Sequence, residues 1–277
     1  MTAPPVSPRL ANIRLHPIKS LDPVHVKEAR IGPGGGLELD RAWALYSVDG
    51  QWVNGKRTAA IHLIRAAFAP DLSSVTLSVP GDQHKIPTTT FAFPADAVAA
   101  SKWFSNFFEQ PITVRHSPEG FPDDTIANGP TIVSTASLQA VCGLFPGMTI
   151  DDARLRFRTT LEIDSDRSAV APAEVPAFWE DQLFSQEERD AVRFRIGEVN
   201  FEGSNPCARC PVPPRDPRTG EVIPGFQKIF SDYRRSHIPA WTPEARFDHY
   251  YRLATNTRVA SAASGKILRA GDSLVLL

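Results

Sequence analysis

The sequence lacks a long hydrophobic run. No apolar stretch reaches about 18 residues, the length that a transmembrane helix needs. The opening Met-Thr-Ala-Pro-Pro-Val-Ser-Pro also lacks the basic and then apolar order of a secretory signal peptide. These absences predict a soluble, cytoplasmic protein with no membrane partner.

A charge excess of either sign is also absent. The chain of 277 residues has 30 Lys and Arg against 31 Asp and Glu, for a formal net charge of -1. A general nucleic-acid binder would show a basic excess or stripe for its phosphate contacts. Nucleic acid is therefore not expected as a partner, and any positively charged binding site must be local.

Cysteine is scarce, with only Cys142, Cys207 and Cys210. In a reducing compartment, a close pair is more often metal-binding or catalytic than structural. Cys142 instead falls on the apolar face of a helix that Ser134 or Thr135 would cap, so we expect it in the core.

The pattern of apolar residues predicts a mainly β protein with peripheral helices (α+β). The first 120 residues consist mainly of short alternating segments broken by Pro, Gly and Asp. Within them, apolar residues at helical spacing predict one helix at residues 97–108. Thr242 and Pro243 predict the start of another helix. Residues 117–130 predict a connection between two halves. Since no βαβ rhythm is present, a β-barrel or sandwich is favoured over a doubly wound sheet.

The most informative segment is Asn205-Pro206-Cys207-Ala208-Arg209-Cys210-Pro211. Zinc needs about four ligands, and no second cysteine pair or spaced histidine pair is present to complete a site. Prolines on both sides oppose the helix that a thioredoxin-type dithiol requires. We favour a rigid loop that offers one thiolate to a metal, which arrives with its other ligands already bound. The alternative is that both cysteines are buried and structural.

Several motifs together resemble a MOSC protein preceded by the MOSC N-terminal β-barrel domain. They occur in the family's order and are Leu15-His16-Pro17-Ile18-Lys19-Ser20, Asp40-Arg41-Ala42-Trp43, Arg57, Ser134-Thr135-Ala136-Ser137-Leu138, Arg156-Phe157-Arg158, the cysteine segment and Gly271-Asp272-Ser273-Leu274-Val275. The resemblance implies an N-terminal β-barrel-like domain at residues 1–120 and a MOSC domain, itself a β-barrel, at residues 125–277.

The resemblance also implies a molybdenum-pterin cofactor in a basic cleft between the domains, with Cys210 as the metal ligand. It implies that pterin or phosphate ligands are Lys19, Ser20, Arg41, Arg57 and Arg158, and that residues at the cofactor edge are Ser134 and Ser137. Arginine forks match phosphate oxygens, which agrees with this assignment.

Two departures from the family pattern affect the expected site. Thr159-Thr160 replaces a common Pro-Asn after Arg158, which puts one amide contact to the cofactor in doubt. Asn128 stands where many relatives have aspartate, which puts a carboxylate near the metal in doubt.

The function implied by the resemblance is a molybdenum-cofactor-dependent oxidoreductase that reduces N-hydroxylated small molecules. Candidate proton donors are His16, His25 and Asn128. The chain has neither a cluster-type run of cysteines nor a Gly-x-Gly-x-x-Gly fingerprint, so we expect a separate reductase or electron-transfer protein to supply electrons. The alternatives are a non-catalytic molybdenum cofactor carrier and a sulfur carrier or sulfurtransferase that uses Cys207 or Cys210.

Overall fold

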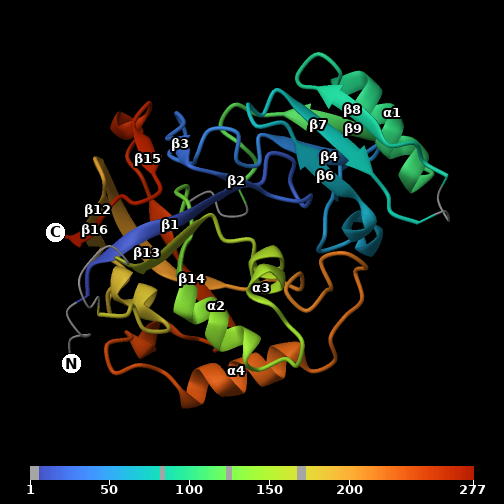
Figure 1. Cartoon of the computed structure of the whole chain (residues 1–277). Helices are drawn as coiled ribbons and strands as arrows, with labels where there is room; N and C mark the ends of the chain where they lie inside the picture. Colours follow the sequence, from blue (N-terminus) through green and yellow to red (C-terminus); the bar gives the residue numbers. More distant parts are fainter. Residues whose placement is uncertain (1–5, 82–84, 123–126, 167–172) are drawn as a thin grey trace.

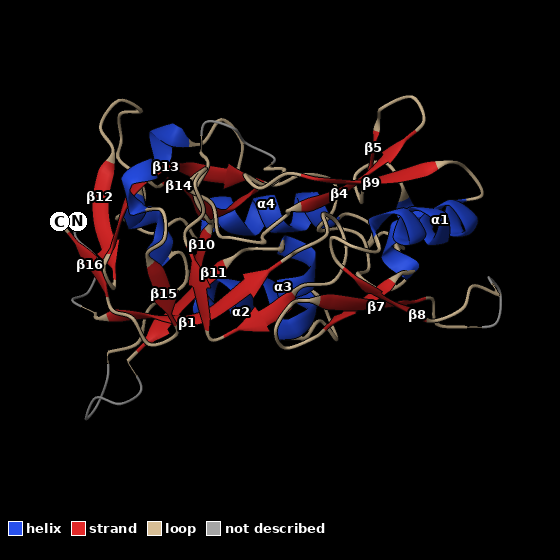
Figure 2. Ribbon diagram, turned by 90° about the horizontal axis from the view of Figure 1, so that it is seen from above, coloured by secondary structure: helices blue, strands red, loops and turns tan. Residues whose placement is uncertain are grey.

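The chain forms two lobes in which strands outnumber helices (Figure 1). This computed structural model describes residues 6–81, 85–122, 127–166 and 173–277. The predicted mainly β fold class with peripheral helices is confirmed, and Figure 2 shows strands in both lobes. Within the described residues, no helix is long and apolar enough to cross a membrane.

The first lobe contains two three-stranded antiparallel sheets and one long helix. One sheet has the order β5-β4-β9 and the other β6-β7-β8. The elements are β4 (Trp43–Ser47), β5 (Trp52–Val53), η1 (Ala59–Leu63), β6 (Arg65–Phe68), β7 (Ser74–Ser78), β8 (Thr89–Ala92), α1 (Ala97–Phe108) and β9 (Ile112–His116).

Helix α1 occupies the range that the apolar spacing predicts. Its buried side chains, Ala100, Trp103, Phe104 and Phe107, recur at helical intervals and pack against strand residues of the same lobe. This core draws all its buried members from residues 18–114. The first lobe therefore has a hydrophobic core of its own.

The second lobe is organised around an eight-stranded sheet of order β16-β12-β13-β14-β10-β11-β1-β2. Its strands are β1 (Pro8–Leu15), β2 (Val24–Val26), β10 (Ile132–Ser134), β11 (Leu161–Ser165), β12 (Val192–Ile196), β13 (Val199–Ala208), β14 (Arg252–Arg258) and β16 (Leu274–Leu276). A separate ribbon pairs β3 (Glu28–Arg30) with β15 (Ile267–Arg269). The start of the chain is thus built into the sheet of the second lobe, with β1 between β11 and β2.

Three α-helices cover the lower part of the second lobe in Figure 1: α2 (Thr135–Cys142), α3 (Ile150–Phe157) and α4 (Phe226–Ser236). Short 3-10 turns are η2 (Trp179–Leu183), η3 (Glu244–Arg246) and η4 (Ser261–Ala263). Ser134 caps α2 by accepting a hydrogen bond from the Ser137 amide, as its position predicts. Cys142, expected in the core, is half-buried against the cluster that these helices form.

Backbone and side-chain contacts between distant segments help to join the lobes. After β1 the chain runs beside β4, where the Lys19 amide donates to the Trp43 carbonyl at 2.7 Å and the Trp43 amide donates to Pro17 at 3.0 Å. The loop that follows β13 reaches back to the first lobe, where the Arg65 guanidinium donates to the Pro217 carbonyl at 3.0 Å. These crossings position residues from both halves around one cavity.

Candidate functional site

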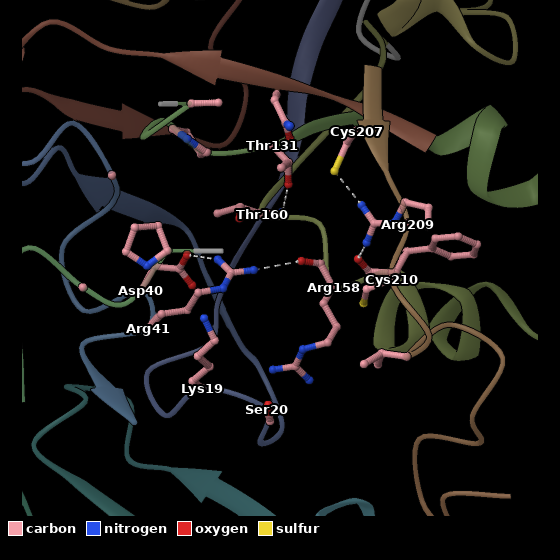
Figure 3. Close-up of a pocket in the computed structure, with 18 of the residues that line it drawn as sticks. Lys19, Ser20, Asp40, Arg41, Thr131, Arg158, Thr160, Cys207, Arg209 and Cys210 are labelled. Carbon is pink, nitrogen blue, oxygen red and sulfur yellow. Dashed lines mark hydrogen bonds and ion pairs between the residues drawn. The ribbon is translucent and has the colours of Figure 1, made fainter. Parts of the chain in front are cut away.

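A cavity of about 380 Å³ lies where the two lobes meet, and Figure 3 shows it in close-up. Lys19 and Ser20 line it from the segment after β1, and Arg41 lines it from the chain just before β4, while Arg158 and Cys210 line it from the second lobe. The volume lies within the range of small-molecule sites. The fold therefore brings five of the eight residues implied by the family resemblance to one place.

Lys19 is buried at the floor of this cavity. Its ammonium donates to the Phe121 carbonyl at 2.7 Å and lies 3.9 Å from the centre of the Trp52 ring. Beside it, the Ser20 hydroxyl oxygen accepts a hydrogen bond from the Gly55 amide at 3.1 Å. These contacts fix a cation and a hydroxyl in position before any ligand is bound.

Asp40 and Arg41 form an ion pair in the cavity wall (Figure 3). The His16 amide donates to the Asp40 carboxylate at 2.8 Å. Burial alone would raise the pKa of Asp40, but Arg41 and the bonds from His16 outweigh it and hold the pKa at about 2. The cavity thus contains an ionised carboxylate that the sequence motifs did not mark as a separate feature.

Arg158 ends helix α3 in the left-handed conformation, with φ of 51°. Its guanidinium donates to the Leu21 carbonyl at 2.8 Å, and its own carbonyl accepts from Arg41 at 3.4 Å. Ser20 and Arg41 also have positive φ, at 74° and 54°. Non-glycine residues in this region cost about 1 kcal/mol or more and concentrate at functional sites, so three of them around one cavity make it a candidate functional site.

The cysteine loop begins at a register shift where β13 ends beside β14. The Arg209 guanidinium donates to the Cys207 sulfur at 3.1 Å and to the Phe157 carbonyl, which fixes the loop on the end of α3 (Figure 3). Within the part of the chain that the structure describes, the Cys210 sulfur has no hydrogen-bond partner. The two thiols therefore differ: Cys207 is held by arginine, and Cys210 is available to a ligand.

Arg156 supports the rest of this loop from below. Its guanidinium donates to the carbonyl oxygens of Pro213 at 3.1 Å and Arg215 at 2.6 Å, and pairs with Asp216 at 3.3 Å. One buried arginine thus satisfies the backbone of a proline-rich segment that cannot form helical hydrogen bonds.

Three residues implied by the resemblance lie apart from the cavity lining. Arg57 is exposed and donates to the Gln51 side chain at 2.8 Å. Ser134 and Ser137 are fully buried, 2.8 Å apart, and both donate to the Glu180 carboxylate, through the Ser134 amide at 3.2 Å and the Ser137 hydroxyl at 2.9 Å. In this structure these serines begin a helix and hold a buried carboxylate.

The two departures from the family pattern both lie at the cavity. Asn128 spans two loops, with its amide donating to the Gly34 carbonyl at 2.5 Å and its oxygen accepting from the Val259 amide at 3.5 Å. The Thr160 amide donates to the Thr131 hydroxyl at 3.2 Å. Both positions therefore shape the cavity wall.

The proton-donor candidates are separated by the fold. His25 is exposed on β2 and does not line the cavity. His16 is fully buried behind Asp40, and burial together with Arg158 lowers its pKa to about 3. Asn128 lines the cavity. His62 also lines it and was missed, because its position in η1 carries no motif in the sequence.

The donor set fits a cofactor that brings a metal together with an anionic group. Among the residues that the structure describes, no three His, Cys, Asp or Glu side chains form a metal-binding cluster. A single thiolate is a suitable additional ligand for a soft or high-valent metal that is already partly coordinated. Lys19, Arg41 and Arg158 are cations that complement a phosphate.

Together, the mainly β lobes and the cationic, thiol-bearing cavity define a two-lobed protein with a candidate ligand site. Comparison with known families finds that residues 7–111 match the MOSC N-terminal beta barrel domain. This range includes most of the first lobe together with β1 and β2 of the second lobe's sheet. The match agrees with the resemblance that the motifs of this part of the chain carry. A search of curated proteins finds no match to the chain.

Proposed function

We propose that the chain binds a molybdenum cofactor in this cavity and reduces N-hydroxylated small molecules in the cytoplasm. In this proposal Cys210 is the protein ligand of the metal. The electrons come from a separate reductase or electron-transfer protein. When bound, the cofactor supplies the two-electron chemistry that removes oxygen from the substrate.

The observation that supports this proposal most strongly is the juxtaposition of thiols and cations around one cavity. Cys207 and Cys210 line it together with Lys19, Arg41 and Arg158. A thiolate ligand and fixed phosphate donors are the two things that a phosphorylated metal-pterin requires. MOSC proteins are associated with molybdenum cofactor binding in general, which points the same way.

Each side chain has a definite role in the proposal. Lys19 and Arg158, whose side chains are fixed by carbonyl contacts, neutralise the phosphate with little loss of conformational entropy on binding. Arg41 is held by Asp40 and lies over the Arg158 backbone, so it joins the two walls. Arg209 donates a hydrogen bond to the Cys207 sulfur, so that Cys207 does not compete with Cys210 as a metal ligand.

The test uses protein purified from a host that makes molybdenum cofactor. Elemental analysis and pterin fluorescence measure loading, and turnover of an amidoxime with an artificial reductant measures activity. Equimolar molybdenum and pterin with turnover support the proposal. Loading without turnover would indicate a cofactor carrier, and a persulfide on Cys207 or Cys210 without molybdenum would indicate a sulfur carrier or sulfurtransferase.

A further inference from the structure

Asn205 and Asn256 form a cross-strand pair at the cavity wall. They lie directly opposite each other in the antiparallel register of β13 and β14, and both line the cavity. Opposite residues of such a pair direct their side chains to the same face of the sheet, with Cβ atoms about 4.5–5.5 Å apart. The register therefore places two carboxamides side by side on one wall.

The alternation of β14 turns the Asn256 side chain toward the cavity. Its neighbours Thr255 and Thr257 are fully buried and do not line the cavity, and both hydroxyls donate to backbone carbonyls, at 2.6 and 2.7 Å. Successive side chains of a strand point to opposite faces, so Asn256 lies on the other face from both threonines. Its carboxamide atoms keep accessible surface and make no hydrogen bond within the described residues. The Asn256 amide is therefore open to a ligand.

Ser204 fixes the orientation of the second carboxamide. The Ser204 hydroxyl donates to Asn205 Oδ1 at 2.9 Å and lies 3.1 Å from the Asn256 carbonyl oxygen. This contact occupies the Asn205 amide oxygen, while the Asn205 NH2 group has no acceptor in the described part of the chain. Since a carboxamide has two N–H donors and one acceptor oxygen, the pair offers oriented donors from Asn205 and both a donor and an acceptor from Asn256.

The carboxamide pair belongs to the thiol end of the cavity. Cys207 follows Asn205 by two residues on β13 and lines the same cavity. Figure 3 shows Cys207 and Thr131 at one end of the site and Lys19 and Ser20 at the other. Carboxamides carry no charge and so do not neutralise a phosphate, which the cation at the Lys19 end can do. An uncharged ligand group with both donors and acceptors is the better match for this wall.

We infer that Asn205 and Asn256 are substrate-contacting residues that hydrogen-bond the amidine group of an uncharged N-hydroxylated substrate. The inference rests on the proposed function and adds to it the residues that recognise the substrate. The Asn205 N–H groups donate to the hydroxyimino nitrogen or oxygen, and the Asn256 oxygen accepts from the amidine NH2 group.

The first test compares the KM for benzamidoxime in Asn205→Ala and Asn256→Ala with that of wild type. The matched control is Asn200→Ala, at an exposed position of β13 outside the cavity. We expect KM to rise about three- to tenfold in the two cavity variants with kcat little changed, as loss of hydrogen bonds between uncharged groups implies. Asn200→Ala should match wild type, and all three variants should keep the wild-type content of pterin and molybdenum.

Two results of this comparison would overturn the inference. Wild-type KM values in both cavity variants would show that the carboxamides do not contact the substrate. Loss of pterin from folded Asn205→Ala or Asn256→Ala protein would show that they contact the cofactor instead.

The second test requires no turnover. Side-chain amide NMR signals of asparagine are recorded for the wild-type protein while benzamidoxime is added. We expect the Asn205 and Asn256 signals to shift saturably while the Asn200 signals do not. If the protein contains no molybdenum but these signals shift, the proposed function fails and the subsite survives. If the protein is loaded and active but the signals do not shift, the subsite is wrong and the proposed function survives.

Discussion

The two loop cysteines present the same atom in different surroundings. Arg209 donates to the Cys207 sulfur at 3.1 Å, whereas Cys210 has no such contact among the described residues. Cys210→Ser replaces a soft thiolate with a hard, protonated hydroxyl. We predict that this variant keeps its melting temperature and much of its pterin but loses amidoxime reduction, while Cys207→Ser keeps a substantial fraction of its activity.

The pair of variants contains its own control, because neither cysteine forms a disulfide in the structure. Melting curves separate loss of function from loss of fold. A dead Cys207→Ser beside an active Cys210→Ser would reverse the ligand assignment. If both variants remain active, neither thiolate is required for the reaction.

The arginines implied as phosphate ligands can be compared in the same way. Arg158 lines the cavity, and Arg57 is exposed and contacts Gln51. Losing a charged contact to phosphate costs about 1.5–3 kcal/mol, so Arg158→Ala should weaken pterin retention ten- to a hundredfold. Arg57→Ala should retain pterin like wild type. Pterin content after gel filtration checks this prediction. Equal losses of pterin from both variants would contradict the different placement of Arg158 and Arg57 relative to the cavity.

Glu180 couples stability to pH. Burial and the neighbouring Asp181 raise its pKa to about 7, although Ser137 and Ser134 hydrogen-bond to it. Between pH 4.5, the unfolded pKa of Glu180, and about pH 7, the folded chain keeps a proton on Glu180 that the unfolded chain has released. The free energy of unfolding therefore decreases as the pH rises through this range. We predict that Glu180→Gln gains stability relative to wild type from pH 5 to pH 8. Urea denaturation checks this, and a pH-independent difference would count against it.

At the scale of elements, helix α4 is anchored by one buried arginine. Arg234 pairs with Asp181 and lies between the rings of Phe178 and Phe247, at 3.9 Å and 5.1 Å. Removing one partner of a buried ion pair costs about 3–5 kcal/mol. We predict a loss of this size in the free energy of unfolding for Arg234→Ala, measured by urea denaturation. The exposed neighbour Arg235→Ala should cost about 1 kcal/mol or less, and equal losses would contradict the anchoring role.

Element prediction from the sequence succeeded where the apolar spacing was long. Helix α1 has four buried side chains at helical intervals, which identified it. Helix α4 was missed, because its buried stripe consists of Phe226 and Phe230 together with Arg234, which hydropathy counts as exposed. The helix expected at Thr242 and Pro243 was wrong, since only the short turn η3 forms there. The Thr242 hydroxyl donates to Asp181 and caps no helix.

The candidate site was recoverable from motifs only in part. Lys19, Arg41 and Arg158 lie in sequence patterns, and the fold brings them to the cavity with Cys210. His62, which also lines the cavity, belongs to no sequence motif, because it reaches the cavity wall only through the packing of η1 near Gly55. Contacts of this kind arise from tertiary structure and leave no local signal.

At the scale of the whole molecule, the second lobe depends on the start of the chain. Strand β1 lies between β11 and β2, and Leu10 and Ile13 are fully buried in the core of that lobe. A fragment of residues 125–277, the predicted MOSC domain, would lack β1 and its buried side chains. We predict that it has no cooperative thermal transition by circular dichroism, unlike the full chain. A fragment that melts like the full chain would show that β1 is dispensable.

The same connectivity explains why one cavity requires the entire chain. Lys19 and Arg41 precede the connection between the halves, and Arg158 and Cys210 follow it. Ligand binding to the cavity should therefore stabilise both lobes against unfolding together, since the ligand binds only the assembled state.

The proposed ligand of this cavity is a molybdenum cofactor. The most direct measurement is the molybdenum and pterin content of the full chain, purified from a host that makes the cofactor. We predict molybdenum and pterin in equimolar amounts with the protein. A folded protein from that host containing neither molybdenum nor pterin would contradict it.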